Sequence, residues 1–139
     1  MRDAEKTVGG IIDKANVSMI GSVDEQGFPN IKAMLPPRKR TGTKEIYFTT
    51  NTFSMRVKQY LENPKASVYF YDKRFYRGVM LKGTMEVLTD AASKVEIWQE
   101  GDDMYYPEGV TAPDYCVLKF TSQNGRYYSN YKSESFLVD

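Results

Sequence analysis

The chain of 139 residues contains no histidine and only one cysteine, Cys116. The absence of histidine excludes Ser-His and Cys-His nucleophilic catalysis, and also zinc or haem sites with histidine ligands inside one chain. A single cysteine cannot form an internal disulfide or a pair of metal ligands. Cys116 stands in the apolar run Tyr115-Cys116-Val117-Leu118, which predicts a buried and unreactive thiol. No side chain stands out as a general acid or base, so we predict neither a catalytic residue nor a metal site.

An excess of charge and long apolar runs are also absent. The formal net charge is +1, so no global field directs the chain toward nucleic acid or a membrane. The basic stretch 38–43 has no interleaved aromatic residues and is typical of a solvated loop. No run could span a bilayer, and residues 1–6 lack the apolar core of a signal peptide. We therefore expect a cytoplasmic protein without a nucleic-acid or membrane partner.

Aromatic residues make up 14% of the chain, which favours a β-rich protein. The length predicts one domain, residues 1–139. Gly83 interrupts a long strand pattern and predicts a bulge or a bend. The fold class we predict is mainly β: an antiparallel barrel of about six to seven strands with short peripheral helices. The predicted strands are 17–23, 29–35, 45–50, 66–71, 79–88, 115–121 and 126–131, with turns that include 24–27 and 123–125.

Three helices are predicted, over residues 3–16, from Thr52 or Ser54 to Asn63, and over residues 91–99. The positions expected to face the interior are Val8, Ile11, Ile12 and Ala15 on the first, Val57, Tyr60 and Leu61 on the second, and Val95 and Trp98 on the third. The segment 101–113 is predicted to be irregular, with Asp102 and Asp103 solvated rather than bound to a metal.

The start of the second helix has the character of an anion site. A helix N-terminus offers unpaired N–H groups and the positive end of the helix dipole. The hydroxyl of Ser54 and the charge of Arg56 add a donor and a cation at the same place. We interpret this stretch as a phosphate-binding corner. The alternative is a capped surface helix whose Arg56 and Lys58 are simply solvated.

The run Phe48-Thr49-Thr50-Asn51, followed by Ser54, Arg56 and the pair Asn63-Pro64, resembles the flavin mononucleotide (FMN) site of the pyridoxamine 5′-phosphate oxidase-like family. The similarity extends from about Asn16 to Gly83 and is looser beyond. This resemblance implies a split β-barrel with a Greek-key-like course, FMN as cofactor, and a homodimer with the flavin at the subunit interface.

The resemblance also implies roles for individual residues. Thr49 and Thr50 fall on the pair that contacts the ring and the ribityl chain. Ser54, Met55 and Arg56 fall on a Ser-Arg-Lys phosphate triplet, in which Met55 lacks the expected charge.

The strand at 29–35 supplies a second part of the family pattern. Lys32 fits a phosphate-binding position, and the backbone of Ala33, Met34 and Leu35 follows the edge of the isoalloxazine ring. Pro37 stands where a second basic residue is usual, and Arg38 is a possible but misplaced substitute.

Two further regions depart from the family or offer aromatic rings. Gly78 replaces a polar residue often found on the strand that passes the flavin. Trp98, Tyr105 and Tyr106 are candidates to cover the ring, while ordinary core or interface packing is the alternative for each.

The resemblance implies an FMN-dependent oxidoreductase of unknown substrate. True pyridoxamine-phosphate oxidases carry an Arg-x-His substrate motif near the C-terminus, whereas residues 132–139 contain no histidine. That particular activity is therefore not expected. The alternatives are a non-enzymatic module that binds flavin, deazaflavin or haem, and a barrel that has lost its cofactor and acts as a structural unit.

Overall fold

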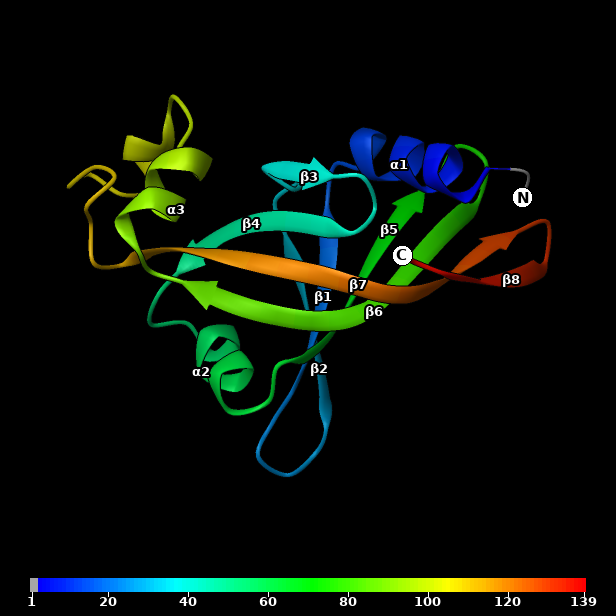
Figure 1. Cartoon of the computed structure of the whole chain (residues 1–139), viewed down its shortest axis with the longest axis horizontal. Coiled ribbons are helices and arrows are strands. Elements are labelled where there is room, and N and C mark those ends of the chain that lie inside the picture. The colour runs from blue at the N-terminus through cyan, green and yellow to red at the C-terminus, as the bar shows by residue number, and fades with distance from the viewer. Residues whose placement is uncertain (1–2) are drawn as a thin grey trace.

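The computed structural model describes residues 3–139 and confirms a mainly β fold (Figure 1). Its strands are β1 (Ser18–Val23), β2 (Pro29–Met34), β3 (Lys39–Thr41), β4 (Glu45–Asn51), β5 (Lys65–Asp72), β6 (Arg77–Leu88), β7 (Tyr115–Ser129) and β8 (Lys132–Leu137). Its helices are α1 (Ala4–Lys14), α2 (Met55–Glu62), α3 (Ala91–Ile97) and the short 3-10 helix η1 (Asp102–Met104). The eight strands exceed the six to seven that the sequence predicts.

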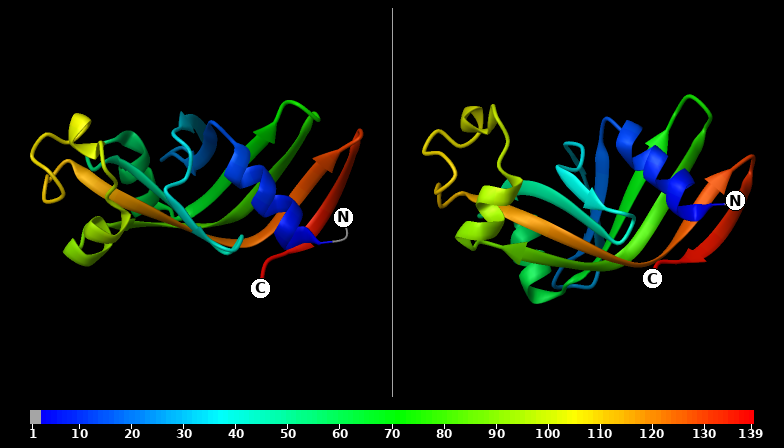
Figure 2. Two further views of the ribbon diagram at one scale, coloured as in Figure 1. Left: turned by 90° about the horizontal axis from the view of Figure 1, so that it is seen from above. Right: turned by 45° about the horizontal axis from the view of Figure 1, so that its top comes forward.

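All of the strand pairs are antiparallel, and the strands form one strongly curved sheet (Figure 2). Their order is β2-β1-β5-β6-β7-β4-β3, and β8 pairs with the second half of β7. The curvature places β1 and β2 behind β6 and β7 in Figure 1, and both α1 and α2 contribute side chains to the interior that the sheet encloses. Among residues 3–139, no helix is both long and apolar enough to cross a membrane.

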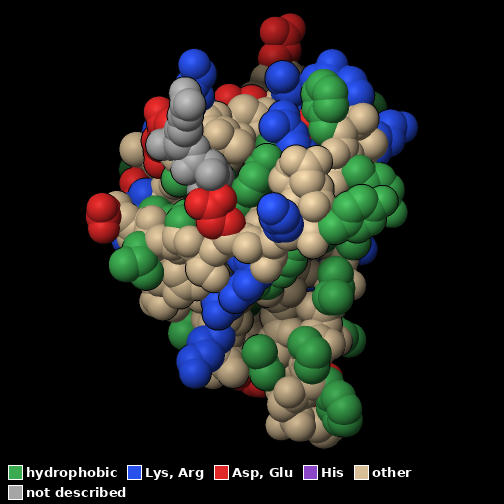
Figure 3. All heavy atoms as spheres, turned by 90° about the vertical axis from the view of Figure 1, so that its right-hand side faces the viewer, with side chains coloured by type: hydrophobic (Ala, Val, Ile, Leu, Met, Phe, Trp, Pro, Cys, Tyr) green, Lys and Arg blue, Asp and Glu red, His purple; other side chains and the backbone are tan. Residues whose placement is uncertain are grey.

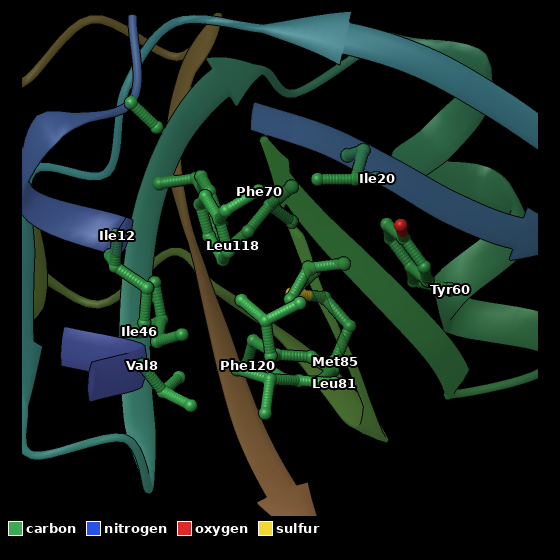
Figure 4. Packing of buried hydrophobic residues seen from close by; sticks show 14 of the residues in the cluster. Val8, Ile12, Ile20, Ile46, Tyr60, Phe70, Leu81, Met85, Leu118 and Phe120 are labelled. Carbon is green, nitrogen blue, oxygen red and sulfur yellow. The ribbon is translucent and has the colours of Figure 1, made fainter. Parts of the chain in front are cut away.

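The concave side of the sheet encloses the main hydrophobic core. Figure 4 shows Val8 and Ile12 of α1 meeting side chains from β1, β4, β6 and β7 in one interior. The predicted inner face of α1 is confirmed, since Val8, Ile11, Ile12 and Ala15 are all buried. Cys116 is also fully buried, as predicted.

The other two helices, α2 and α3, bury different faces from those predicted. Leu61 on α2 is 70% exposed and Val95 on α3 is 63% exposed, so both assignments were wrong. Polar residues take the buried places instead: Gln59 on α2 and Lys94 on α3. Each of these has a tertiary hydrogen-bond partner, which apolar periodicity cannot reveal.

The C-terminal strands differ most from the prediction. The turn expected at 123–125 does not form, because β7 continues through it with β6 on one side and β8 on the other. The actual turn is Asn130-Tyr131, where both residues have positive φ (52° and 61°), the geometry of a tight two-residue hairpin. The strand β8 that follows was missed, and so was β3, which lies in the predicted basic loop.

Gly83 marks a bulge, as the sequence predicts. The pairing of β6 with β7 shifts register between Lys82 and Gly83. A Cβ atom at Gly83 would lie only 1.8 Å from the backbone oxygen of Thr121, closer than any real contact. Only glycine therefore fits at this point of the ladder.

We expect Gly83→Ala to lower the free energy of unfolding by about 3 kcal/mol, because the backbone of β7 must move to admit the methyl group. Gly10→Ala is the matched control, since no atom lies within 4 Å of its added Cβ and α1 should gain roughly 0.5–1 kcal/mol. Urea denaturation of the wild type and both variants measures these changes in the free energy of unfolding. Equal stability of the two variants would show that the bulge does not need glycine.

Candidate cofactor-binding site

The connection between β4 and α2 is a tightly hydrogen-bonded corner. The side-chain oxygen of Asn51 accepts from the N–H of Phe53 (2.8 Å), and its carbonyl accepts from the N–H of Ser54 (3.0 Å). Ser54 is the N-cap of α2, and its Oγ accepts from the N–H of Val57 (3.3 Å). Thr52, the other predicted cap, instead donates its backbone N–H to the carbonyl of Asp114 (2.9 Å).

The corner presents a set of unused hydrogen-bond donors. The N–H groups of Met55 and Arg56 have no acceptor within residues 3–139, as expected for the first turn of a helix. The Ser54 hydroxyl accepts from Val57, so its own proton is free to donate. The half-buried Arg56 makes no side-chain hydrogen bond or ion pair with any described residue. This donor set, with one cation, fits the phosphate group of FMN.

Two hydrogen bonds fix α2 against β1. The Ser22 hydroxyl donates to Oε1 of Gln59 (2.5 Å), and both residues are buried. The Tyr60 hydroxyl donates to the carbonyl of Gly21 (2.9 Å). Burial raises the pKa of Tyr60, and the nearby positive charge of Arg56 partly opposes that shift. The helix that carries Ser54 and Arg56 is thus anchored to the strand next to β2.

The pairing of β1 with β2 decides where Lys32 lies. Lys32 is opposite Ile20 and two residues from Asn30, which is opposite Ser22. Because side chains alternate between the faces of a strand, Lys32 shares the face of Ser22, against which α2 packs. Lys32 and the helix that carries Arg56 therefore lie on the same side of the strand pair.

The residues predicted to follow the edge of the isoalloxazine ring do not share one face of β2. Ala33 is opposite Met19 and faces the outer side of the sheet, whereas Met34 packs against the main core. Leu35 follows the strand and is 57% exposed. In the described sheet β2 pairs only with β1, so one row of its backbone N–H and C=O groups faces outward. These groups can meet the polar edge of a flat ring.

Thr49 and Thr50 lie at the end of β4, just before the corner. They pair with Val117 and Cys116 of β7 and are half-buried. The Sγ atom of Cys116 donates to the carbonyl of Thr50 (3.7 Å), and burial raises the pKa of this thiol. Thr49 and Thr50 are thus held at the corner through the β4–β7 ladder.

Arg38 does not replace the basic residue missing at Pro37. Its guanidinium forms an ion pair with Asp102, so its charge is already used. Asp102 also accepts from the N–H of Gln99 (2.8 Å) and is only 4% exposed. The prediction that Asp102 is solvated was therefore wrong, while Asp103 is exposed as expected.

The three aromatic candidates for covering the ring have different environments. Trp98 and Tyr106 pack with Tyr115, with ring centroids 5.2 and 5.0 Å from it, in a second hydrophobic cluster. Tyr105 is 55% exposed. Packing thus accounts for two of these aromatic residues, and Tyr105 alone remains open to a ligand or partner.

Sequence reasoning missed Asn51 as the residue that shapes the corner and Ser22 and Gln59 as the anchor of α2. Asn51 carried a usable signal, since asparagine often closes a turn through its own side chain. Gln59 carried none, because its hydrogen-bond partner lies 37 residues away in the sequence.

We expect Gln59→Leu to lower the free energy of unfolding by about 1–3 kcal/mol, because it leaves the buried Ser22 hydroxyl without a partner. Adding Ser22→Ala should recover part of this loss, since both polar groups are then removed. Urea denaturation of the four members of the mutant cycle tests the coupling. Strictly additive losses would show that the hydrogen bond does not stabilise the fold.

Comparison with known proteins agrees with this architecture. The family model described as "Pyridoxamine 5'-phosphate oxidase like" matches residues 3–138. A crystal structure from Clostridium acetobutylicum, of a protein related to general stress protein 26 of B. subtilis, is 39% identical with a TM-score of 0.88, and covers 99% of this chain and 98% of that chain. An FMN-binding, pyridoxamine 5′-phosphate oxidase-related protein from Nostoc punctiforme is 12% identical and shares the fold alone, with a TM-score of 0.69 and 96% of each chain covered.

A curated relative, the pyridoxine/pyridoxamine 5′-phosphate oxidase of Agrobacterium fabrum, is 32% identical over 119 residues, 84% of this chain. The chain spans 52% of that relative and 36% of the one from Rhizobium leguminosarum. The family model, in contrast, extends over nearly all of residues 1–139. This split-barrel chain therefore belongs to the pyridoxamine 5′-phosphate oxidase-like family.

Proposed function

We propose that this protein is an FMN-binding flavoprotein that acts as an oxidoreductase on a substrate not yet identified. The observation that carries the proposal is the corner at the start of α2, where Ser54, Arg56 and two free N–H groups converge beside the end of β4. Lys32 adds a second cation from the same side of the β1–β2 pair. The Nostoc relative with the same fold is named as FMN-binding, which supports the assignment.

In this proposal each group of residues has one task. Lys32, Ser54 and Arg56 hold the phosphate, with Met55 contributing its N–H group. The strand end at Thr49 and Thr50 orients the ribityl chain, and the free backbone edge from Ala33 to Leu35 lies along the ring. The bound flavin supplies the hydride or electron chemistry, and the protein sets its orientation and access.

A homodimer is part of the same proposal. The corner and the edge of β2 form only one wall for a flat ligand, whereas flavin sites enclose most of the ligand surface. Ile31 on β2 is 74% exposed and Met55 at the corner is 60% exposed, so apolar surface beside the site is left uncovered. A second subunit that packs there supplies the other wall.

A non-enzymatic flavin or deazaflavin module is the second candidate. The observation that favours it is the small number of cationic side chains available to bind the phosphate. Met55 and Pro37 are neutral, and Arg38 forms an ion pair with Asp102. Weak retention of the cofactor suits a reversible carrier or sensor. Reduction of the bound flavin by a nicotinamide cofactor, followed by turnover with an acceptor, separates the enzyme from the module.

Absorbance spectra before and after addition of excess FMN and desalting give the first test. We expect retained bands of oxidised flavin, because the corner supplies donors and charge for the phosphate. A protein that remains colourless after FMN addition would overturn the proposed cofactor. Deazaflavin and haem would then be tested in the same way.

Arg56→Ala gives a sharper test of the binding mode. We expect it to weaken FMN binding by about 1.5–3 kcal/mol, roughly 10- to 150-fold, because a charge-assisted contact to phosphate is lost. Riboflavin has no phosphate, so its affinity should change by less than about threefold. Fluorescence titration of both ligands measures the two changes.

Lys58→Ala is the matched control for this experiment. Lys58 is two residues further along α2, is largely exposed, and lies 3.6 Å from Glu25 rather than facing the corner. Its replacement should leave both affinities nearly unchanged. Equal losses of FMN and riboflavin in Arg56→Ala would mean that Arg56 supports the fold and does not bind phosphate.

A further inference from the structure

Two segments at opposite ends of the molecule differ in charge. At one end lie the turns of the β5–β6 and β7–β8 hairpins, here called the hairpin tips (residues 72–77 and 126–134). The hairpin tips contain five Lys or Arg residues and two acidic residues, Asp72 and Glu134. Figure 3 faces this end and shows Lys and Arg beside a group of hydrophobic side chains.

The hairpin tips also expose an unusual amount of aromatic surface. The exposed fraction is 58% for Phe75, 81% for Tyr76 and essentially complete for Tyr131. The guanidinium of Arg74 lies 4.4 Å from the ring centre of Phe75. A hollow of about 460 Å³ separates the two turns and is lined by Phe75, Tyr76, Tyr128 and Tyr131 among others. Large exposed apolar surface of this kind marks a contact site.

The backbone of these tips is held in a costly conformation. Tyr76, Asn130 and Tyr131 all have positive φ, at 50°, 52° and 61°. Asn130 and Tyr131 adopt it because a tight two-residue turn requires positive φ at both positions, and the Tyr76 ring packs edge-on against Tyr71 with 5.9 Å between ring centroids.

The opposite end is acidic. Residues 100–114, here called the acidic segment, contain five Asp or Glu residues and no Lys or Arg. Only Asp102 is neutralised within the described chain, by Arg38. The segment also exposes apolar surface, with Met104 73% and Tyr105 55% exposed. In Figures 1 and 2 it lies beyond α3, at the far end of the long axis from the β7–β8 hairpin.

The acidic segment lies next to the cofactor corner. The backbone N–H of Thr52 donates to the carbonyl of Asp114, so the end of the segment and the turn before α2 are hydrogen-bonded to each other. A partner that covers the acidic segment as far as Asp114 therefore reaches the turn that leads into α2.

We propose that the hairpin tips of one copy dock on the acidic segment of a second copy, beside the cofactor corner of that copy. In a two-fold symmetric dimer whose subunits have antiparallel long axes, the hairpin tips of each copy contact the acidic segment of the other copy. Cations and aromatic rings of the tips then face carboxylates, Met104 and Tyr105 of the segment, which matches both charge and apolar surface. This inference rests on the proposed homodimer and names the surfaces that align it.

Charge reversal tests the contact. The basic-end variant is Lys73→Glu with Arg74→Glu, and the acidic-end variant is Asp103→Lys with Glu108→Lys; all four residues are exposed. Each variant alone places like charges against each other at both contacts of its dimer. We expect the dimer dissociation constant of each to rise about tenfold or more at about 50 mM salt, measured by sedimentation velocity.

Mixing the two variants gives the decisive result. In the heterodimer of one basic-end and one acidic-end variant, opposite charges meet at both contacts. We therefore expect the mixture to regain the wild-type dissociation constant, although neither variant does so alone. Failure of the mixture to re-associate, with both variants folded by circular dichroism, would overturn the proposed docking.

Two controls complete the design. Glu25→Lys with Glu62→Lys changes the net charge as much as the acidic-end variant, at exposed sites on the β1–β2 turn and the end of α2, and should leave the dimer unchanged. Lys73→Glu with Lys132→Glu keeps Arg74 over Phe75 and should behave like the basic-end variant.

The outcomes also separate this inference from the proposed function. A wild-type protein that is monomeric at all concentrations contradicts the homodimer itself. A wild-type dimer that is insensitive to every reversal contradicts only the docking of the hairpin tips. Flavin retention by the monomeric basic-end variant, measured after desalting, should fall if the partner closes the site and stay constant if it does not.

Discussion

The long pairing of β6 with β7 is the constraint on which the rest of the structure depends. Both strands belong to this ladder over nearly their whole length, and β7 also carries β4 on its first half and β8 on its second. The register shift at Gly83 bends the ladder in the middle. The corner between β4 and α2 and the hairpin tips consequently lie at opposite ends of one continuous element, and their separation is set by strand length.

Local chemistry made the corner predictable from the sequence. A serine cap, an arginine in the first turn and an Asn-Pro stop act within a few residues of one another, and the structure has the helix where these signals place it. The inner face of α1 was predictable for a similar reason, because four apolar residues at helical spacing leave no other buried face. The resemblance then added the fold and the candidate ligand.

The features that the sequence did not predict have one physical cause: each depends on a contact with residues that are distant in the sequence. Asn124-Gly125 has the composition of a turn, but strands on both sides satisfy its backbone and keep it extended. The strand β8 is mostly polar and exposed, so its pairing depends on backbone hydrogen bonds that leave no apolar alternation. Gln59, Lys94 and Asp102 can be buried because each has a polar partner from a distant part of the chain. The partners are the Ser22 hydroxyl, the Ala112 carbonyl and the Arg38 guanidinium, respectively. The roles of Lys32 and Arg56 toward a ligand remain predictions.

The free edge of β2 has a consequence beyond ligand binding. A strand with one unpaired row of backbone groups is a template on which another chain can add a strand and begin an aggregate. Proline at position 29 and the pair Pro36-Pro37 bracket this edge, and the charge of Lys32 lies between them. Proline cannot donate to a ladder and an unpaired charge resists stacking, so strand addition is confined to a very short stretch. The edge of β2 can thus stay unpaired within one chain while the prolines and the charge limit polymerisation.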